Sequence, residues 1–128
     1  MVGQSVLARE HNWQIRKLLR ANLEALGLEV RVAVNQQHGL EALKNGQPDL
    51  ILLDLDLPND GAVKLLHALD LRFQDRKLPI LLLSTEPPAR SLLRGSQVAG
   101  WLIKPFDVAN LIEWIEDLLG PSTVQGGN

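Results

Sequence analysis

Short segments rich in apolar residues alternate with longer amphipathic stretches along nearly the whole chain. Five such segments are too short for helices and are closed by polar or turn-forming residues, which is typical of strands. They lie at residues 6–8, 29–34, 50–53, 78–83 and 101–103. Each is followed by a stretch with apolar residues at helical spacing, so the pattern predicts five strand–helix pairs.

Capping signals mark the helices between and after these strands. Asn12 and Gly27 bracket the first helix, and Asp107 and Gly120 bracket the last. The three helices between them are expected around residues 40–43, around residues 63–69 and from residue 89 onward. Two consecutive prolines, Pro87-Pro88, are expected to delay the fourth helix and to stiffen or shorten it.

Alternating strands and helices predict an α/β fold with a doubly wound parallel sheet, because parallel strands need crossovers and these cover both faces of the sheet. A chain of 128 residues with 45% apolar and 22% charged residues forms a single core. We therefore expect one domain over residues 1–121, with residues 122–128 as a tail or the start of a linker. Ligands of such sheets bind beyond the carboxyl ends of the strands.

Charge and composition narrow the function classes. Thirteen basic and 15 acidic residues give a formal net charge of -2, which predicts no direct binding of nucleic acid and no binding to an anionic membrane. The chain has no cysteine, so a disulfide framework, a thiolate zinc site and a cysteine nucleophile are excluded. No apolar run approaches a membrane span and no signal peptide is evident, so we expect a cytoplasmic protein.

Chemically reactive side chains follow four of the five predicted strands. These residues are Glu10 and His11, Asp54 and Asp56, Ser84, and Lys104. Because the carboxyl ends of parallel strands meet at one edge of the sheet, the residues are expected to converge on one cleft. Any one of them, taken singly, also fits a helix cap, since carboxylates and hydroxyls cap the helices that follow strands.

Three sequence motifs give the cleft a family resemblance. They run from Asp54 to Gly61, from Pro79 to Ser84, and over Lys104-Pro105-Phe106. With these motifs in this order among alternating strands and helices, the chain resembles the receiver domain of bacterial two-component response regulators from roughly Ser5 to Leu119. The resemblance implies a flavodoxin-like fold with strand order 2-1-3-4-5. It also implies a signalling domain rather than an enzyme, in which Asp54 accepts a phosphoryl group from a histidine kinase, a phosphotransfer protein or a small phosphodonor.

The resemblance further assigns roles to the other motif residues. Lys104 pairs with the phosphoryl group, and the Ser84 hydroxyl moves towards it after transfer. Trp101 takes the place of an aromatic switch residue coupled to that hydroxyl, although packing in the core or on the surface explains an indole equally well. In-line phosphoryl transfer calls for these residue types in any case: a carboxylate nucleophile, a fixed cation and a divalent metal ion.

The metal site departs from the family pattern. Receiver domains hold Mg2+ with two adjacent acids after the first strand, and this chain has Glu10 and His11 there. Mg2+ prefers oxygen ligands, so His11 predicts weaker Mg2+ binding and better tolerance of Mn2+ or zinc. The predicted ligands are Glu10, His11, Asp54 and Asp56, where the Asp56 carboxylate replaces the missing acid or is only a solvated loop residue. The loop from Pro58 to Gly61 is also about one residue shorter than usual.

Two further readings remain open. A receiver-like fold without phosphate control would act as an interaction or dimerisation module, which His11 favours and the retained Asp54, Ser84 and Lys104 oppose. Asp54-Leu55-Asp56 also resembles the nucleophile and acid pair of haloacid-dehalogenase-like phosphatases.

The partners expected besides the kinase are a second copy and an effector domain. The second copy would bind through the last helix–strand–helix face with Trp101 and Trp114, and the effector domain would be joined at the C-terminal side.

Overall fold

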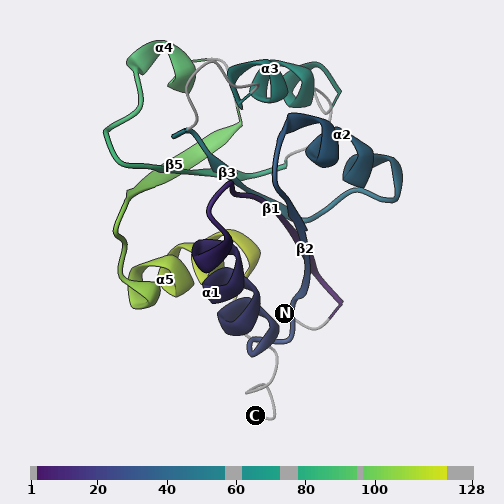
Figure 1. Cartoon of the computed structure of the whole chain (residues 1–128), viewed down its shortest axis with the longest axis vertical. Coiled ribbons are helices and arrows are strands. Elements are labelled where there is room, and N and C mark those ends of the chain that lie inside the picture. Colours follow the sequence, from purple (N-terminus) through teal and green to yellow (C-terminus); the bar gives the residue numbers. More distant parts are fainter. Residues whose placement is uncertain (1–2, 57–61, 73–77, 95–96, 121–128) are drawn as a thin grey trace.

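A computed structural model of the chain describes residues 3–56, 62–72, 78–94 and 97–120. Five strands alternate with five helices in these ranges (Figure 1). The strands are β1 (Ser5–Arg9), β2 (Glu29–Ala33), β3 (Leu50–Asp54), β4 (Ile80–Ser84) and β5 (Val98–Ile103). The helices are α1 (Trp13–Glu24), α2 (Gln36–Lys44), α3 (Ala62–Arg72), α4 (Arg90–Leu93) and α5 (Val108–Leu119). The sheet is parallel in the order β2-β1-β3-β4-β5, which confirms the predicted topology.

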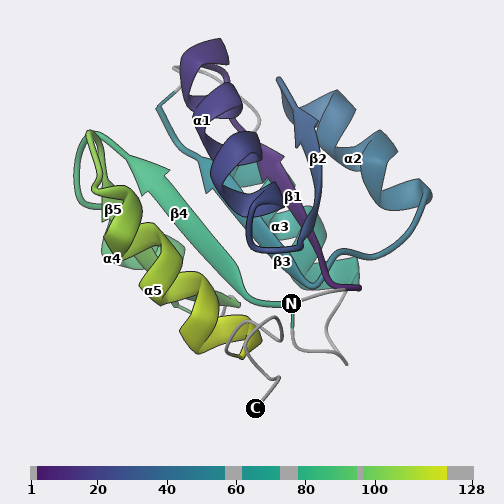
Figure 2. The same cartoon turned by 90° about the horizontal axis from the view of Figure 1, so that it is seen from below.

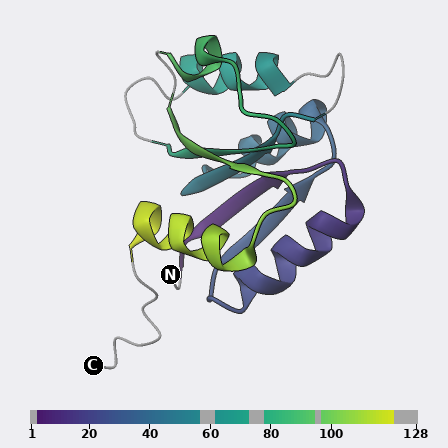
Figure 3. The same ribbon diagram turned by 90° about the vertical axis from the view of Figure 1, so that its left-hand side faces the viewer.

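Helices cover both faces of the sheet. One face packs against α1 and α5, and the other lies under α2, α3 and α4 (Figures 2 and 3). Successive residues of β1 point to opposite sides: Val6 and Ala8 join the core under α1 and α5, whereas Leu7 joins the core under α2 and α3. The central strands β3 and β4 are buried along their whole length because both of their faces are covered.

The predicted capping residues occupy their expected positions. Asn12 Oδ1 accepts hydrogen bonds from the backbone N–H groups of Gln14 (2.9 Å) and Ile15 (3.2 Å) at the start of α1. Asp107 Oδ1 accepts one from Ala109 N (2.9 Å) at the start of α5. Gly27 has a positive φ of 89°, which a residue without a Cβ adopts at low cost just after a helix. The two caps fix where α1 and α5 begin after the carboxyl ends of β1 and β5.

The start of the fifth strand differs from the sequence prediction, whereas the length of the fourth helix agrees with it. β5 begins at Val98 rather than at residue 101, since its first residues pair with Ile80 and Leu81 of β4 although Ala99 and Gly100 carry little apolar signal. α4 has only four residues, in agreement with the shortening expected from Pro87-Pro88. In the described part of the chain, no helix is both long and apolar enough to cross a membrane.

Gly100 and Trp114 join β5 to α5. A Cβ on Gly100 would lie 2.8 Å from Cζ2 of the Trp114 indole and 2.9 Å from its Cζ3, which is closer than atoms can pack. The close approach lets the half-buried indole pack against the strand, so Trp114 is a packing residue of this layer. His38 and His67 are exposed on α2 and α3.

Replacing Gly100 with Ala is expected to lower the free energy of unfolding by about 2 kcal/mol, because the large and rigid indole must move to admit the methyl group. Urea denaturation followed by far-UV circular dichroism measures this effect. Gly39→Ala is the matched control, since the nearest atoms to its Cβ would be the flexible Leu65 Cδ2 at 3.3 Å and Arg9 Cγ at 4.0 Å, and alanine favours the helix. Equal midpoints for the Gly100 variant and the wild type would contradict the packing argument.

Candidate functional site

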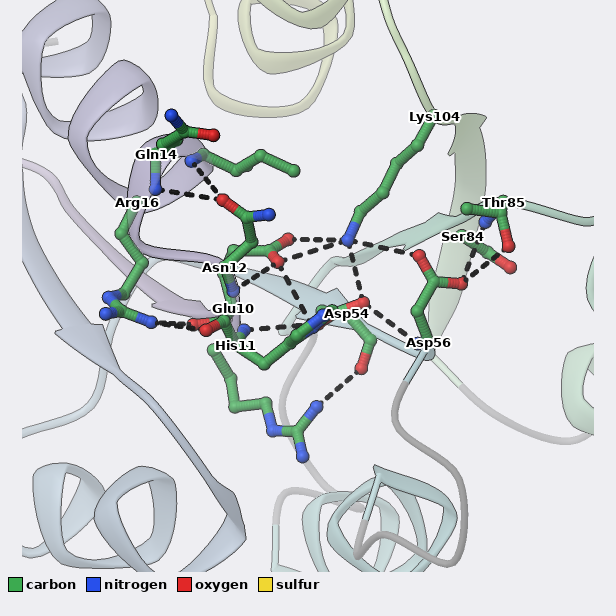
Figure 4. Close-up of polar contacts among 12 residues, drawn as sticks. Glu10, His11, Asn12, Gln14, Arg16, Asp54, Asp56, Ser84, Thr85 and Lys104 are labelled. Carbon is green, nitrogen blue, oxygen red and sulfur yellow. Dashed lines mark hydrogen bonds and ion pairs between the residues drawn. The ribbon is translucent and has the colours of Figure 1, made fainter.

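The polar residues that end the strands meet at the carboxyl edge of the sheet (Figure 4). Asp54 ends β3 and Glu10 directly follows β1, and both side chains are fully buried. β1 and β3 are neighbours in the sheet, so the two carboxylates lie in one layer. The convergence predicted for Glu10, Asp54 and Lys104 is therefore present in the structure.

Lys104 forms the hub of the site. Its Nζ lies 2.9 Å from Asp54 Oδ1, 3.0 Å from Glu10 Oε1 and 3.2 Å from Asp56 Oδ2. The ammonium also donates a hydrogen bond to Glu10 Oε2 at 3.1 Å. Its backbone N–H donates to Ser84 O (2.8 Å), which anchors the lysine at the β4 edge. One ammonium thus contacts three carboxylates, and its side chain is only 8% exposed.

His11 contacts the other side of Asp54. Its Nδ1 is hydrogen-bonded to Asp54 Oδ2, and its backbone N–H donates to the same oxygen at 3.2 Å. The imidazole Nδ1 is also 3.4 Å from Glu10 Oε2. Arg16 Nη1 holds the backbone carbonyls of Glu10 and His11, each at 2.8 Å. Both Asp54 oxygens therefore have partners, Oδ2 with His11 and Oδ1 with Lys104 and the Asp56 N–H (2.9 Å).

The electrostatics of the site shift the pKa values of its two buried acids in opposite directions. Burial by itself would raise the pKa of Asp54, but hydrogen bonds from His11, the Asp56 N–H and Lys104 outweigh it and lower the pKa to about 2. Burial raises the pKa of Glu10, with a smaller contribution from the negative charge of Asp54. Lys104 has a raised pKa because the hydrogen bonds to Asp54 and Glu10 outweigh its own desolvation. Asp54 is thus an ionised, buried carboxylate held by cationic and N–H donors.

The donor atoms of Glu10, His11 and Asp54 lie within 4.8 Å of one another, close enough to hold one metal ion. Glu10 Oε1 is buried and accepts no hydrogen bond from the described residues, although Lys104 Nζ forms an ion pair with it at 3.0 Å. An oxygen with spare lone pairs beside a second carboxylate fits a divalent cation. The third donor is an imidazole nitrogen, which fits an all-oxygen Mg2+ shell poorly.

Asp56 and Ser84 take other partners. Asp56 Oδ1 accepts hydrogen bonds from Thr85 N (2.8 Å) and Thr85 Oγ1 (3.1 Å), while its second oxygen meets Lys104. The Asp56 carboxylate therefore lies outside the three-residue cluster, and its role as a metal ligand stays a prediction. Ser84 Oγ donates to Glu86 O (2.6 Å) and accepts from Glu86 N (3.2 Å), so the structure does not bring this hydroxyl to Asp54.

Trp101 and Arg9 complete the surroundings. Trp101 is 39% exposed on β5, two residues from the equally exposed Ile103. Arg9 was not among the predicted site residues, although its Nη1 donates to Asp54 O at 2.7 Å. The one sequence signal for it was a charged residue at the end of a buried strand.

The loop from Pro58 to Gly61 and the tail 122–128 lie outside the described residues.

Comparisons with known proteins agree with this geometry. The profile of the response regulator receiver domain matches residues 6–116. PhoB of Pseudomonas aeruginosa, a phosphate regulon transcriptional regulatory protein, is 28% identical over 121 residues, which are 93% of this chain and 53% of PhoB. KdpE of Escherichia coli, a KDP operon transcriptional regulatory protein, is 33% identical over 109 residues, which are 84% of this chain and 47% of KdpE.

Solved structures show the same fold. The chemotaxis protein CheY4 of Vibrio cholerae superposes with a TM-score of 0.81 at 26% identity, over 91% of this chain and 98% of CheY4. The response regulator TrrA of Thermotoga maritima, in complex with Mg2+-BeF, gives 0.76 at 27% identity, over 91% of this chain and 99% of TrrA.

A five-stranded parallel sheet that gathers an ionised aspartate, a second buried acid and a lysine at one edge defines a receiver domain of the two-component signalling type. The chain belongs to the response regulator receiver domain family. It spans about half the length of the transcriptional regulators PhoB and KdpE, at 53% and 47%. Receiver domains bind Mg2+ at an acidic pocket, and Glu10 and Asp54 form the acidic pair here.

Proposed function

We propose that Asp54 is the phosphoacceptor of this receiver domain and that a histidine kinase or a phosphotransfer protein supplies the phosphoryl group. The observation that carries this proposal is the state of Asp54: a fully buried carboxylate with a pKa lowered to about 2, in contact with Lys104 at 2.9 Å. An ionised carboxylate is the nucleophile that phosphoryl transfer requires. The alternative as a dehalogenase-like phosphatase has less support, because both carboxylate oxygens of Asp56 are already held, one by Lys104 and the other by Thr85.

In the proposed transfer, a carboxylate oxygen of Asp54 attacks the phosphorus of a phosphohistidine. A P–O bond forms at Asp54 as the P–N bond breaks, and the electron pair returns to the imidazole nitrogen of the donor. Lys104 then lies beside the acyl phosphate and offsets its added negative charge. The domain itself supplies positioning and charge, so any transfer from a small phosphodonor is self-catalysed.

Glu10 and Asp54 would hold the divalent cation, which neutralises phosphoryl oxygens when it is bound. We infer that His11 makes this site more tolerant of Mn2+ than an all-carboxylate site, since manganese accepts nitrogen ligands more readily than Mg2+. The Nδ1 position beside both carboxylates supports this inference. Asp56 is the proposed additional oxygen ligand once its contacts with Lys104 and Thr85 rearrange.

The proposed switch uses Ser84 and Trp101. Phosphorylation would draw the Ser84 hydroxyl away from Glu86 and towards the phosphoryl group. Trp101 lies opposite Leu82 in the neighbouring strand and is half exposed, so it has room to change rotamer. α4 has only four residues, and Trp101 and Ile103 stay exposed beside it. We propose this face of β5 for contact with a second copy or an effector domain, in a cytoplasmic protein.

The proposal is tested by the intact mass of the protein after incubation with acetyl phosphate, with Mg2+, with Mn2+ and with a chelator. A phosphoryl adduct is expected with either metal ion and only a trace with the chelator. Asp54→Asn is expected to form no adduct, and Asp49→Asn, an exposed aspartate at the opposite edge of the sheet, is the matched control.

The second candidate is a phosphate-independent interaction module. The contact between His11 and Asp54 Oδ2 favours it, because the imidazole covers an oxygen that a phosphoacceptor must free. Absence of an adduct under every metal condition, in a folded protein, would replace the phosphoacceptor proposal with this one.

A further inference from the structure

Arg9 is a charged residue in the interior of the domain. It ends β1 between Ala33 of β2 and Leu53 of β3, and only 1% of its surface is exposed. Its stem lies on the face covered by α2 and α3, where a Cβ on Gly39 would be 4.0 Å from Arg9 Cγ. Burying a guanidinium is costly unless its contacts compensate for the lost water. The contact that matters for the site is the hydrogen bond from Nη1 to Asp54 O at 2.7 Å.

That hydrogen bond fixes the peptide group from which the acceptor carboxylate extends. Arg9 holds the carbonyl of the Asp54–Leu55 peptide, and the N–H of the same peptide donates to Leu83 O of β4 at 2.9 Å. The next N–H, that of Asp56, donates to Asp54 Oδ1 at 2.9 Å. The peptide is thus clamped from both neighbouring strands, and the clamp sets the direction of the Asp54 carboxylate.

The guanidinium also places a permanent positive charge on the backbone side of Asp54. Among the described residues, the site holds three acids, Glu10, Asp54 and Asp56, around the single ammonium of Lys104. Arg9 brings a second fixed cation to the backbone of Asp54, and arginine stays charged at all physiological pH values. A positive charge there opposes the approach of a divalent cation and favours the additional negative charge of an acyl phosphate.

We propose that Arg9 is a positioning residue of the receiver site, which aligns Asp54 through its peptide carbonyl, weakens divalent-cation binding and promotes phosphorylation. The effect on phosphorylation rests on the proposed function of Asp54. The effect on cation binding does not, because Mg2+ or Mn2+ alone reports it. The two effects differ in sign, so loss of Arg9 tightens cation binding while it slows adduct formation. A residue that only stabilised the fold would weaken both.

The experiment compares Arg9→Met, Arg9→Gln and Arg9→Lys with the wild type. Affinity for Mg2+ and for Mn2+ is measured by calorimetric titration without phosphodonor, and adduct formation from acetyl phosphate is followed by intact mass at saturating Mg2+. Arg9→Met and Arg9→Gln are expected to bind the cations at least about threefold more tightly and to form the adduct about tenfold more slowly. Arg9→Lys keeps the charge and is expected to keep the wild-type affinity.

Arg31→Met is the matched control. Arg31 lies on β2, opposite Leu7 of β1, and its guanidinium likewise binds backbone carbonyls, those of Ala42 (2.6 Å) and Gly46 (3.0 Å), at a distance from the acidic cluster. The Arg31→Met substitution is expected to lower the stability of the fold and to leave the cation affinity unchanged. Should Arg9→Met not fold, Arg9→Gln decides, since its amide is polar like the guanidinium but is shorter and carries no charge.

Unchanged or weaker cation binding in Arg9→Gln would overturn the proposal, as would an equal change in the Arg31 variant. A wild-type protein that binds cations but forms no adduct would refute the phosphoacceptor function alone, and the cation titrations would still test Arg9.

Discussion

Lys104→Met is expected to lower the free energy of unfolding by about 3 kcal/mol at pH 7 in metal-free buffer. The variant keeps three carboxylates but loses the ammonium that lies 2.9–3.2 Å from all of them. Glu10 and Asp54 are fully buried, so water cannot replace the lost contact. Removing one partner of a buried ion pair costs more than the pair contributes, because the other charge remains uncompensated. Urea denaturation measures the change.

The loss should depend on pH in a defined direction. In the wild type, Asp54 has a pKa of about 2 in the folded state and 3.8 when unfolded, so its stabilising contribution is present above pH 3.8 and is lost as the pH falls towards 2. Without Lys104, the pKa values of Asp54 and Glu10 rise in the folded state. Glu10, whose pKa is already raised by burial, then binds a proton more readily in the folded variant than in the unfolded chain, so this part of the lost stability returns as the pH falls. The difference in the free energy of unfolding between Lys104→Met and the wild type therefore becomes smaller as the pH falls.

Arg20→Met is the matched control for this comparison. Arg20 pairs with Glu24 at 3.4 Å on the surface of α1, and the two side chains are 45% and 49% exposed. Such a pair contributes less than about 0.5 kcal/mol. Equal losses in the Lys104 and Arg20 variants would show that the three-carboxylate hub does not stabilise the fold. Added Mg2+ should stabilise Lys104→Met more than Arg20→Met, since a cation can replace the missing charge.

The fold was predictable because its strands are short apolar runs with clear stops. Where the prediction was wrong, the local signal was weak: β5 begins at Val98, but Ala99 and Gly100 are small and resemble a loop. Gly100 is small for a tertiary reason, the packing of Trp114, which cannot be seen from neighbours in sequence. α4 is short, as expected, because the two prolines before it restrict the backbone locally.

For the site, the sequence was sufficient to predict which strand ends meet. Glu10, Asp54 and Lys104 converge because parallel strands end at one edge, and this follows from topology alone. The hydrogen-bond partners of each side chain could not be predicted in this way, because side-chain rotamers depend on contacts between elements that are far apart in the sequence. The Ser84 hydroxyl pairs with Glu86, and Arg9 turns under the sheet to the carbonyl of Asp54. In the sequence, Arg9 looks like a polar residue that closes a strand.

His11→Asp is expected to raise Mg2+ affinity by at least about tenfold. The imidazole nitrogen lies beside Asp54 Oδ2 and 3.4 Å from Glu10 Oε2, so a carboxylate there completes an oxygen site of three acids. The added negative charge attracts both units of the metal charge, and Mg2+ prefers oxygen donors to nitrogen. The preference for Mn2+ over Mg2+ should fall at the same time, because the nitrogen ligand is gone.

The same substitution should make the metal-free protein less stable. It removes the contact between His11 and Asp54 and places a third acid beside two buried ones, so the like charges repel and Mg2+ becomes a stabilising ligand. Calorimetric titration with Mg2+ and Mn2+, together with thermal unfolding at several Mg2+ concentrations, measures both effects. His38→Asp, on an exposed position of α2, makes the same change in charge away from the site. If both variants bind Mg2+ as the wild type does, His11 is not at the metal position, and the weak fit of this site to Mg2+ needs another cause.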